Sequence, residues 1–373
     1  GSRVLISTRI RHLLSDAFAV EIGKPTVEDS IKILMAAADL SGTDRAPSEA
    51  REIVELCGRL PLALVMAGKL ITELGVGDHW DGVSSILRDE LRGNEQASAE
   101  QGVIRASLAG LKGNERDRSG AQRLFKLFGL VPEDTSCPLE CLQLMHDAVY
   151  ETSKSTSILH IRKWLKILID RSLVLGTVDR ASLHDLVLDF TIAMYSKAEL
   201  MGAHRRVVEM FRAKRVTNAA GIRAWEVGNR DDALTAYVID EATHHVTNAR
   251  DLDDPSSDSL PLSWLTDQPH DKLCDAVALV LGESELVRAA EESEAGGEMW
   301  LAACRWAAAA TVVFQTRGVV DHMPFLKRAA SSVSKARESQ TAGRFSMDQI
   351  DHLDLTLVNR FIVYDPAGLA EHS

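Results

Sequence analysis

The sequence is poor in the residues that build disulfide-held or metal-held folds. It contains 5 cysteines in 373 residues, at positions 57, 137, 141, 274 and 304. They form no repeated Cys-x-x-Cys pair, and no histidines accompany them at a zinc spacing. Cys137 and Cys141 are one helical turn apart, but no third and fourth ligand is spaced to join them. The pattern argues against a disulfide framework or a zinc module and is typical of a reducing compartment.

Long hydrophobic runs are also missing. The longest candidate, from Met299 to Phe314, has 16 residues and contains Arg305, whereas a membrane-spanning helix needs about 20 apolar residues. We therefore expect a cytoplasmic protein with no membrane partner. Basic residues number 42 against 54 acidic ones, and the resulting net charge of −12 argues against a general nucleic-acid binder.

A third absence concerns nucleotide hydrolysis. The two Gly-Lys pairs, Gly23-Lys24 and Gly68-Lys69, each lack the upstream glycine and the following Ser or Thr of G-x-x-x-x-G-K-[ST]. The amides and lysine of that loop hold the phosphates, and hydrolysis also needs acidic residues for Mg²⁺ and water. As given, the chain is not a competent ATPase. ATPase activity and Mg²⁺ binding would require an upstream half that contains these elements.

The composition that is present, 45% hydrophobic and 26% charged, is that of a globular protein with two or three domains. Apolar residues recur at helical spacing through most of the chain, which predicts a mainly α protein. In the first half the predicted helices are Thr26–Ala38, Ser48–Cys57, Pro61 to the break at Gly75, a helix through Ile104 and Leu111, Leu124–Leu130, Leu139–Val149 and Ile158–Ile169.

The first residues have a different pattern. Arg3-Val4-Leu5-Ile6-Ser7 is typical of a buried strand of a parallel sheet. Arg9 follows it and would lie beyond the carboxyl end of the strand, where ligands bind in open α/β sheets. Because one strand cannot form a sheet, we expect its neighbours upstream of Gly1 and interpret the chain as a fragment.

A small hairpin is predicted after these helices. Leu173–Leu175 and Ala181–Leu183 have strand character, with a turn over Gly176–Arg180. Helices followed by a hairpin have the outline of a winged helix. From Asp185 onward the sequence is almost entirely helical, and a tetratricopeptide-like pattern around Trp225 and Tyr237 favours an irregular α-solenoid.

Three short motifs occur in order along the first half of the chain: the segment Gly1–Arg9, Gly58-Arg59-Leu60-Pro61 and Leu183-His184-Asp185. With the helices between them they resemble the C-terminal two-thirds of an NB-ARC module, the nucleotide switch of the STAND class of signalling ATPases. The resemblance covers residues 1 to about 192. It departs from the family pattern at Ser7, where Thr is usual, at Arg59, which separates the glycine from Leu60, and at Leu183, which replaces Met.

The resemblance implies a nucleotide contact in each motif. Arg9 would be the sensor residue facing the terminal phosphates, a role that suits the planar donors of a guanidinium group. Pro61, with Leu60 beside it, would lie against the adenine. His184 would donate a hydrogen bond to the β-phosphate of ADP, and Asp185 would begin the next helix and orient the histidine.

The resemblance also implies a function and a domain order. ADP would hold the switch closed, and ATP would open it for homo-oligomerisation in defence or cell-death signalling. The domains would be a nucleotide-binding remnant (1–24), a helical bundle (25–93), a winged helix (94–192) and a helical sensor or scaffold region (193–373) that binds protein partners.

Two other functions remain open at this point. Arg162, Lys163 and Lys166 form a basic face that could approach DNA in a winged-helix regulator, although the apolar residues between them favour packing. Alternatively, the chain is a degenerate helical scaffold that has lost nucleotide control.

Several side chains are assigned structural roles. His244 and His245 are interpreted as an exposed helix face, and Trp300 and Trp306 as parts of a helical core. Leu186, Phe190 and Met194 recur every four residues and are expected to anchor the helix that follows His184.

Overall fold

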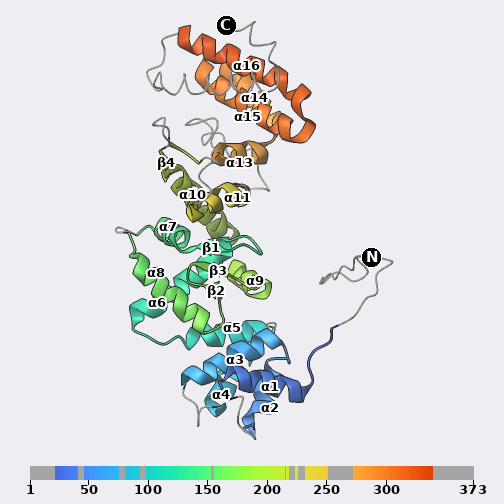
Figure 1. The fold of residues 1–373 in the computed structure, drawn as a ribbon, viewed down its shortest axis with the longest axis vertical. Helices are drawn as coiled ribbons and strands as arrows, with labels where there is room; N and C mark the ends of the chain where they lie inside the picture. Colours follow the sequence, from blue (N-terminus) through green and yellow to red (C-terminus); the bar gives the residue numbers. More distant parts are fainter. Residues whose placement is uncertain are drawn as a thin grey trace, which may run out of the picture. The chain divides into compact units, whose positions relative to one another are not determined.

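The computed structural model describes residues 22–40, 46–74, 80–92, 98–152, 155–214, 216–217, 223–225, 232–250 and 272–338. These residues form fifteen α-helices and two small antiparallel sheets, so the prediction of a mainly α protein is confirmed (Figure 1). Contacts group the chain into two units, residues 1–111 and 112–373. The predicted strand Arg3–Ser7 lies outside the described residues, and the division into four domains stays a prediction.

Helices α1 to α5 make up the described part of the first unit. Thr26 caps α1 because its side chain accepts a hydrogen bond from the Asp29 amide at 3.1 Å, as the sequence predicted. Helices α1 and α3 pack closely at Gly68, where an added Cβ would come within 2.5 Å of the Ala37 side chain. The bounds are α1 Val27–Ala37, α2 Glu49–Leu56, α3 Pro61–Leu74, α4 Trp80–Arg92 and α5 Ala99–Ala109.

Helix α4 was not predicted. Its buried residues Trp80, Val83 and Leu87 follow the i, i+3, i+7 spacing of one helix face. The stretch has few apolar residues, and this spacing is the signal that identifies the helix.

In the second unit, three helices and a three-stranded sheet follow one another. The sheet order is β1-β3-β2, with β3 in the centre and both pairings antiparallel. Helix α6 continues into a short 3₁₀ turn, η1. The bounds are α6 Glu115–Leu127, η1 Phe128–Leu130, β1 Cys137–Pro138, α7 Leu139–Val149, α8 Ile158–Asp170, β2 Leu175–Thr177, β3 Arg180–Ser182 and α9 Asp185–Ala193.

The hairpin exists, but its predicted strand positions were wrong. Leu173 and Val174 are buried, and both backbone amides donate to the carbonyl of Leu168 at the end of α8. These two residues therefore finish the helix instead of entering the sheet. The first strand starts at Leu175 and runs through Gly176, whose φ of +85° suits glycine.

The predicted core face of α9 was wrong at two of its three residues, whereas the third, Phe190, is half-buried with its ring centre 6.3 Å from that of Phe125. Leu186 and Met194 are each 36% exposed, whereas Val187, Leu188 and Thr191 are buried. Helix α9 packs on η1, and this contact sets which face is covered.

The remaining helices carry a second core. Trp300 and Trp306 are buried with the alanines of α15 against α14 and α16, so their predicted core role is confirmed. None of the described helices combines the length and apolar character needed to cross a membrane. The bounds are α10 Lys197–Ala213, β4 Val216–Thr217, β5 Arg223–Ala224, α11 Ala233–Asn248, α13 Lys272–Leu281, α14 Glu283–Ala295, α15 Met299–Arg317 and α16 Val319–Glu338.

Three histidines gather where α10 packs on α11, so the interpretation of His244 and His245 as an exposed face was wrong. His245 is fully buried and His244 is half-buried. The Nδ1 atoms of His204 and His245 lie 3.0 Å apart, and Tyr237 Oη lies 3.2 Å from His245 Nε2.

Burial controls the charge of this cluster. Burial lowers the pKa of His204 to about 3. Burial, with the neighbouring His204 and His244, lowers the pKa of His245 well below its usual value. All three histidines are therefore neutral in the folded protein at pH 7.

This cluster predicts acid sensitivity. Unfolded histidines take up protons below about pH 6.5, whereas the buried ones do not, so stability is present above that pH and is lost as the pH falls below it. Between pH 7.5 and 5.5, His204 and His245 together should lower the free energy of unfolding by about 3 kcal/mol. Urea denaturation at the two pH values measures this loss.

The variant His204→Gln keeps a hydrogen-bonding side chain but cannot titrate in this range, so the loss should shrink by about 1 kcal/mol. An undiminished loss in His204→Gln contradicts the explanation.

Candidate functional site

Two of the predicted nucleotide contacts lie at the turn between α2 and α3. Gly58 and Arg59 both have positive φ, +59° and +57°, and reverse the chain after α2. Pro61 is the first residue of α3, as predicted, where its fixed φ and missing N–H are tolerated. Its ring is exposed, and Leu60 is half-buried.

The other two described contacts lie where β3 leads into α9. His184 caps α9, and its Nδ1 accepts a hydrogen bond from the Leu186 amide at 3.3 Å. This bond places the ring proton on Nε2, which leaves Nε2–H as the donor of an exposed side chain. Asp185 is the half-buried first residue of the helix.

These residues belong to separate parts of the protein. Leu60 and Pro61 are in the first unit, His184 and Asp185 are in the second, and Arg9 lies outside the described residues. A common nucleotide site that joins them stays a prediction.

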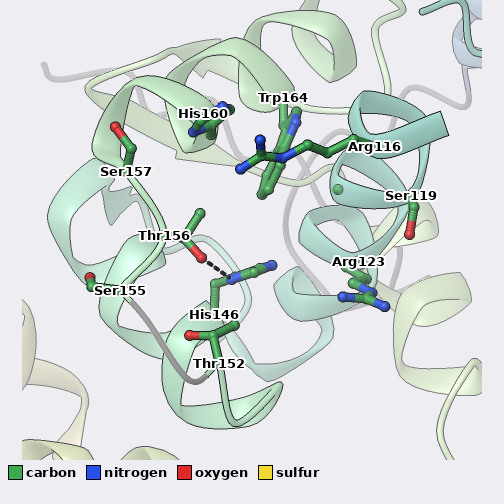
Figure 2. A pocket seen from close by; sticks show the side chains of 11 residues that line it. Arg116, Ser119, Arg123, His146, Thr152, Ser155, Thr156, Ser157, His160 and Trp164 are labelled. Atoms are coloured by element: carbon green, nitrogen blue, oxygen red, sulfur yellow. Dashed lines mark hydrogen bonds between the residues drawn. The ribbon is translucent and has the colours of Figure 1, made fainter. Parts of the chain in front are cut away.

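The second unit contains a pocket of its own, which the sequence analysis missed. It has a volume of about 440 Å³ and lies among α6, α7, α8 and the segment that leads into α8 (Figure 2). Its lining is rich in basic, imidazole and hydroxyl groups. The lining residues are Arg116, Ser119, Gly120, Arg123, His146, Thr152, Ser155, Thr156, Ser157, His160 and Trp164.

One wall of the pocket depends on a close contact between α6 and α8. The indole Nε1 of Trp164 donates to Asp117 at 3.2 Å, and the Lys163 ammonium donates to the same carboxylate at 2.6 Å. The hydrogen bond from Lys163 lowers the pKa of Asp117. The Trp164 ring lies directly against Gly120, where an added Cβ would come within 2.2 Å of it.

The opposite side is organised by Asp147 near the end of α7. Its carboxylate accepts hydrogen bonds from the hydroxyls of Thr152 at 3.0 Å and Ser155 at 2.7 Å, and from the Thr156 amide at 3.0 Å. Burial raises the pKa of Asp147, but these hydrogen bonds outweigh it and hold the pKa below its usual value. The ionised carboxylate thus fixes the segment that carries Thr156 into the pocket.

The basic face of α8 has carboxylate partners. Lys163 pairs with Asp117 at 2.6 Å, Arg162 with Asp179 at 2.8 Å and Lys166 with Asp170 at 3.0 Å. These pairings neutralise the positive charge that a DNA backbone would need, which weighs against the DNA-binding alternative.

The pocket had a signal in the sequence. Arg116, Ser119, Gly120 and Arg123 follow the i, i+3, i+4, i+7 spacing of one helix face. A stripe of this kind is usually solvated, and only the packing of α8 against it creates a pocket.

Comparisons with known proteins assign no family: no family model matches the chain, and no curated protein sequence matches it.

The contact at Gly120 predicts a strong effect of one methyl group. Gly120→Ala should displace Trp164 from Asp117 and lower the free energy of unfolding by about 1–3 kcal/mol, the range for overpacked sites. Chemical denaturation followed by tryptophan fluorescence measures the change.

The matched control is Gly202→Ala in α10, where an added Cβ meets no atom within 4 Å. There the same substitution should raise the free energy of unfolding by about 0.5–1 kcal/mol, because alanine is the better helix former. Equal effects at the two positions would show that packing against Trp164 is not the cause.

Proposed function

We propose that the chain is part of a nucleotide-dependent molecular switch of the STAND/NB-ARC type. ADP holds the switch closed, and ATP opens it so that it oligomerises and signals. The observation that carries the proposal is the order of the three motifs that end at Arg9, Pro61 and His184. The local geometry of the two described motifs supports it.

The geometry at His184 suits a phosphate contact. The amide of Leu186 holds Nδ1, so Nε2–H is the free donor, and the side chain is exposed where a ligand can reach it. A neutral imidazole N–H is an effective donor to a phosphate oxygen. Asp185 follows immediately and begins α9, as the proposal requires.

The geometry at Pro61 suits a base contact. The positive φ values of Gly58 and Arg59 bring the exposed proline ring to the start of α3, where it presents a flat apolar face with no N–H. Arg59 within the motif is accommodated in this turn and leaves Pro61 at the helix start.

The order of the elements agrees with the proposed module. A helical bundle is followed by α6 to α8 and the β1-β3-β2 sheet, which together form a winged helix in this proposal. The helices from α10 onward would be an irregular solenoid that binds protein partners or keeps the switch closed. The proposed location is the cytoplasm.

The first test is the coding sequence upstream of Gly1. The proposal expects a G-x-x-x-x-G-K-[ST] loop followed by a strand that ends in acidic residues, because these elements bind the phosphates and Mg²⁺. An unrelated domain there would favour the degenerate scaffold.

In the complete protein, Asp185→Val should weaken the closed state. If Asp185 orients His184, its loss should speed ADP release about tenfold or more, the effect of losing one hydrogen bond to a charged group. Self-association without a stimulus should increase as well. Release of labelled ADP and light scattering measure the two effects.

Asp189→Val is the matched control, since Asp189 is an exposed acid one turn further along α9. It should leave ADP retention unchanged. A purified complete protein that holds no ADP, or equal effects of the two variants, would count against the switch.

A further inference from the structure

The pocket in the second unit is lined by two arginines that have no carboxylate partner in the described part of the chain. Arg116 and Arg123 lie one above the other on α6 and both line the pocket. Neither forms an ion pair with a carboxylate among the residues that the structure describes. Arg118, on another face of the same helix, pairs with Glu115 at 2.6 Å. Arg123 lies against the ring of Tyr150, 5.5 Å from its centre.

The second observation is a buried histidine with an unused ring nitrogen. His146 is 2% exposed, and its Nε2 has no hydrogen-bond partner. Its Nδ1 lies 3.4 Å from the Thr156 hydroxyl and 3.6 Å from Asp147 Oδ1. Figure 2 shows the other ring nitrogen on the side of the pocket where Arg123 lies. A buried polar atom without a partner is unfavourable unless a ligand or water satisfies it.

The electrostatics of the pocket favour an anion. None of the lining residues is acidic. The nearby Asp117 is paired with Lys163, and Asp147 is turned toward the hydroxyls and the amide of its own segment. The pocket also lies at the start of α8, whose partial positive charge favours anions.

We propose that this pocket binds a phosphate-bearing small molecule, with its phosphate group between Arg116, Arg123 and His146. The site does not depend on the proposed switch, since neither Pro61 nor His184 lines it. Two guanidinium groups and an imidazole offer a set of donors suited to a phosphate dianion.

The free donors can be identified group by group. The hydroxyl protons of Thr152 and Ser155 already go to Asp147, so these residues build the pocket wall. Ser119 and Ser157 also line the pocket, and the Ser157 oxygen caps α8 by accepting from the Leu159 amide at 3.3 Å.

The size and the aromatic wall indicate that the ligand carries an organic group. A volume of about 440 Å³ lies within the range of small-molecule sites and exceeds the needs of a single phosphate ion. Trp164 and His160, with ring centres 5.9 Å apart and planes inclined by 39°, form an aromatic wall beside Arg116 (Figure 2). A ring or another planar group on the ligand can stack there.

Binding should also move a proton. Burial lowers the pKa of His146 despite the neighbouring Asp147, and Arg123 lowers it further. A bound dianion favours the imidazolium form, whose Nδ1–H faces Thr156 and Asp147 and whose Nε2–H faces the ligand. The other titratable and charged groups around His146 are Arg116, Arg123 and His160 in the pocket lining, Tyr150 with its ring centre 5.0 Å from that of His146, and the Asp117–Lys163 pair.

The test is calorimetric titration of the 373-residue chain with two probes, inorganic phosphate and phenyl phosphate. Phenyl phosphate should bind more tightly, because its ring can lie on Trp164. Arg116→Gln and Arg123→Gln should each weaken binding about tenfold or more. Arg118→Gln is the matched control, with the same loss of charge on the same helix outside the pocket, and should change binding less than about twofold.

Equal affinities for inorganic phosphate and phenyl phosphate would still support a phosphate site but would identify free phosphate as its occupant. Binding that Arg118→Gln weakens as much as Arg116→Gln would overturn the site, because the attraction would then come from overall charge. Absence of binding of both probes at low ionic strength would overturn it as well.

Proton uptake tests the role of His146 separately. Titrations at pH 7.5 in buffers of different ionisation enthalpy should show close to one proton taken up per phenyl phosphate. His146→Gln should bind without this uptake. If His146→Gln does not fold, Arg123→Gln is the second test, and its proton uptake at a given concentration of phenyl phosphate should fall together with its affinity. Binding of phenyl phosphate to the wild-type chain without proton uptake would contradict the assignment of His146.

Discussion

The second unit depends on one buried carboxylate that joins two helices. Asp117, near the start of α6, accepts hydrogen bonds from the indole of Trp164 and the ammonium of Lys163, both on α8. A carboxylate with 4% exposure requires such partners, because an unpaired buried charge would be strongly unfavourable. The pairing fixes the rotation of α8 about its own axis, so that Trp164 lies flat against Gly120 and its neighbours on α8 face outward.

That rotation determines what each face of α8 can do. Because Lys163 pairs with Asp117, its charge is neutralised within the protein. Arg162 and Lys166 pair with Asp179 and Asp170. The two arginines that line the pocket, Arg116 and Arg123 on α6, have no carboxylate partner among the described residues and flank the Trp164 contact. The site where an anion can bind is therefore the groove between the helices, and the exposed face of α8 is close to neutral.

The local signals in the sequence identified most helices, because caps and periodicity are short-range. Thr26, Gly58 and Pro61 lie at the expected helix ends, and α7 has the predicted bounds. The errors arose where tertiary packing decides. The hairpin was misplaced because Leu173 and Val174 pack under α8, and α9 turns its other face to η1. The pocket was missed because its walls come from three separate helices and from the segment that leads into α8. No pairwise pattern along one helix contains that information.

The two groups of buried histidines show why burial alone does not identify a site. His204 and His245 hydrogen-bond to each other, and Tyr237 hydrogen-bonds to the other ring nitrogen of His245. His146 is equally buried, yet only one of its nitrogens has partners, and the other lies in a pocket between unpaired arginines. In the first case burial is balanced within the core, so proton uptake can only destabilise the fold. In the second, an imidazolium ion would have Asp147 on one side and a bound anion on the other. His244 Nε2 is also buried without a partner but does not line the pocket, so what distinguishes His146 is the combination of an unsatisfied nitrogen with a pocket lined by two arginines.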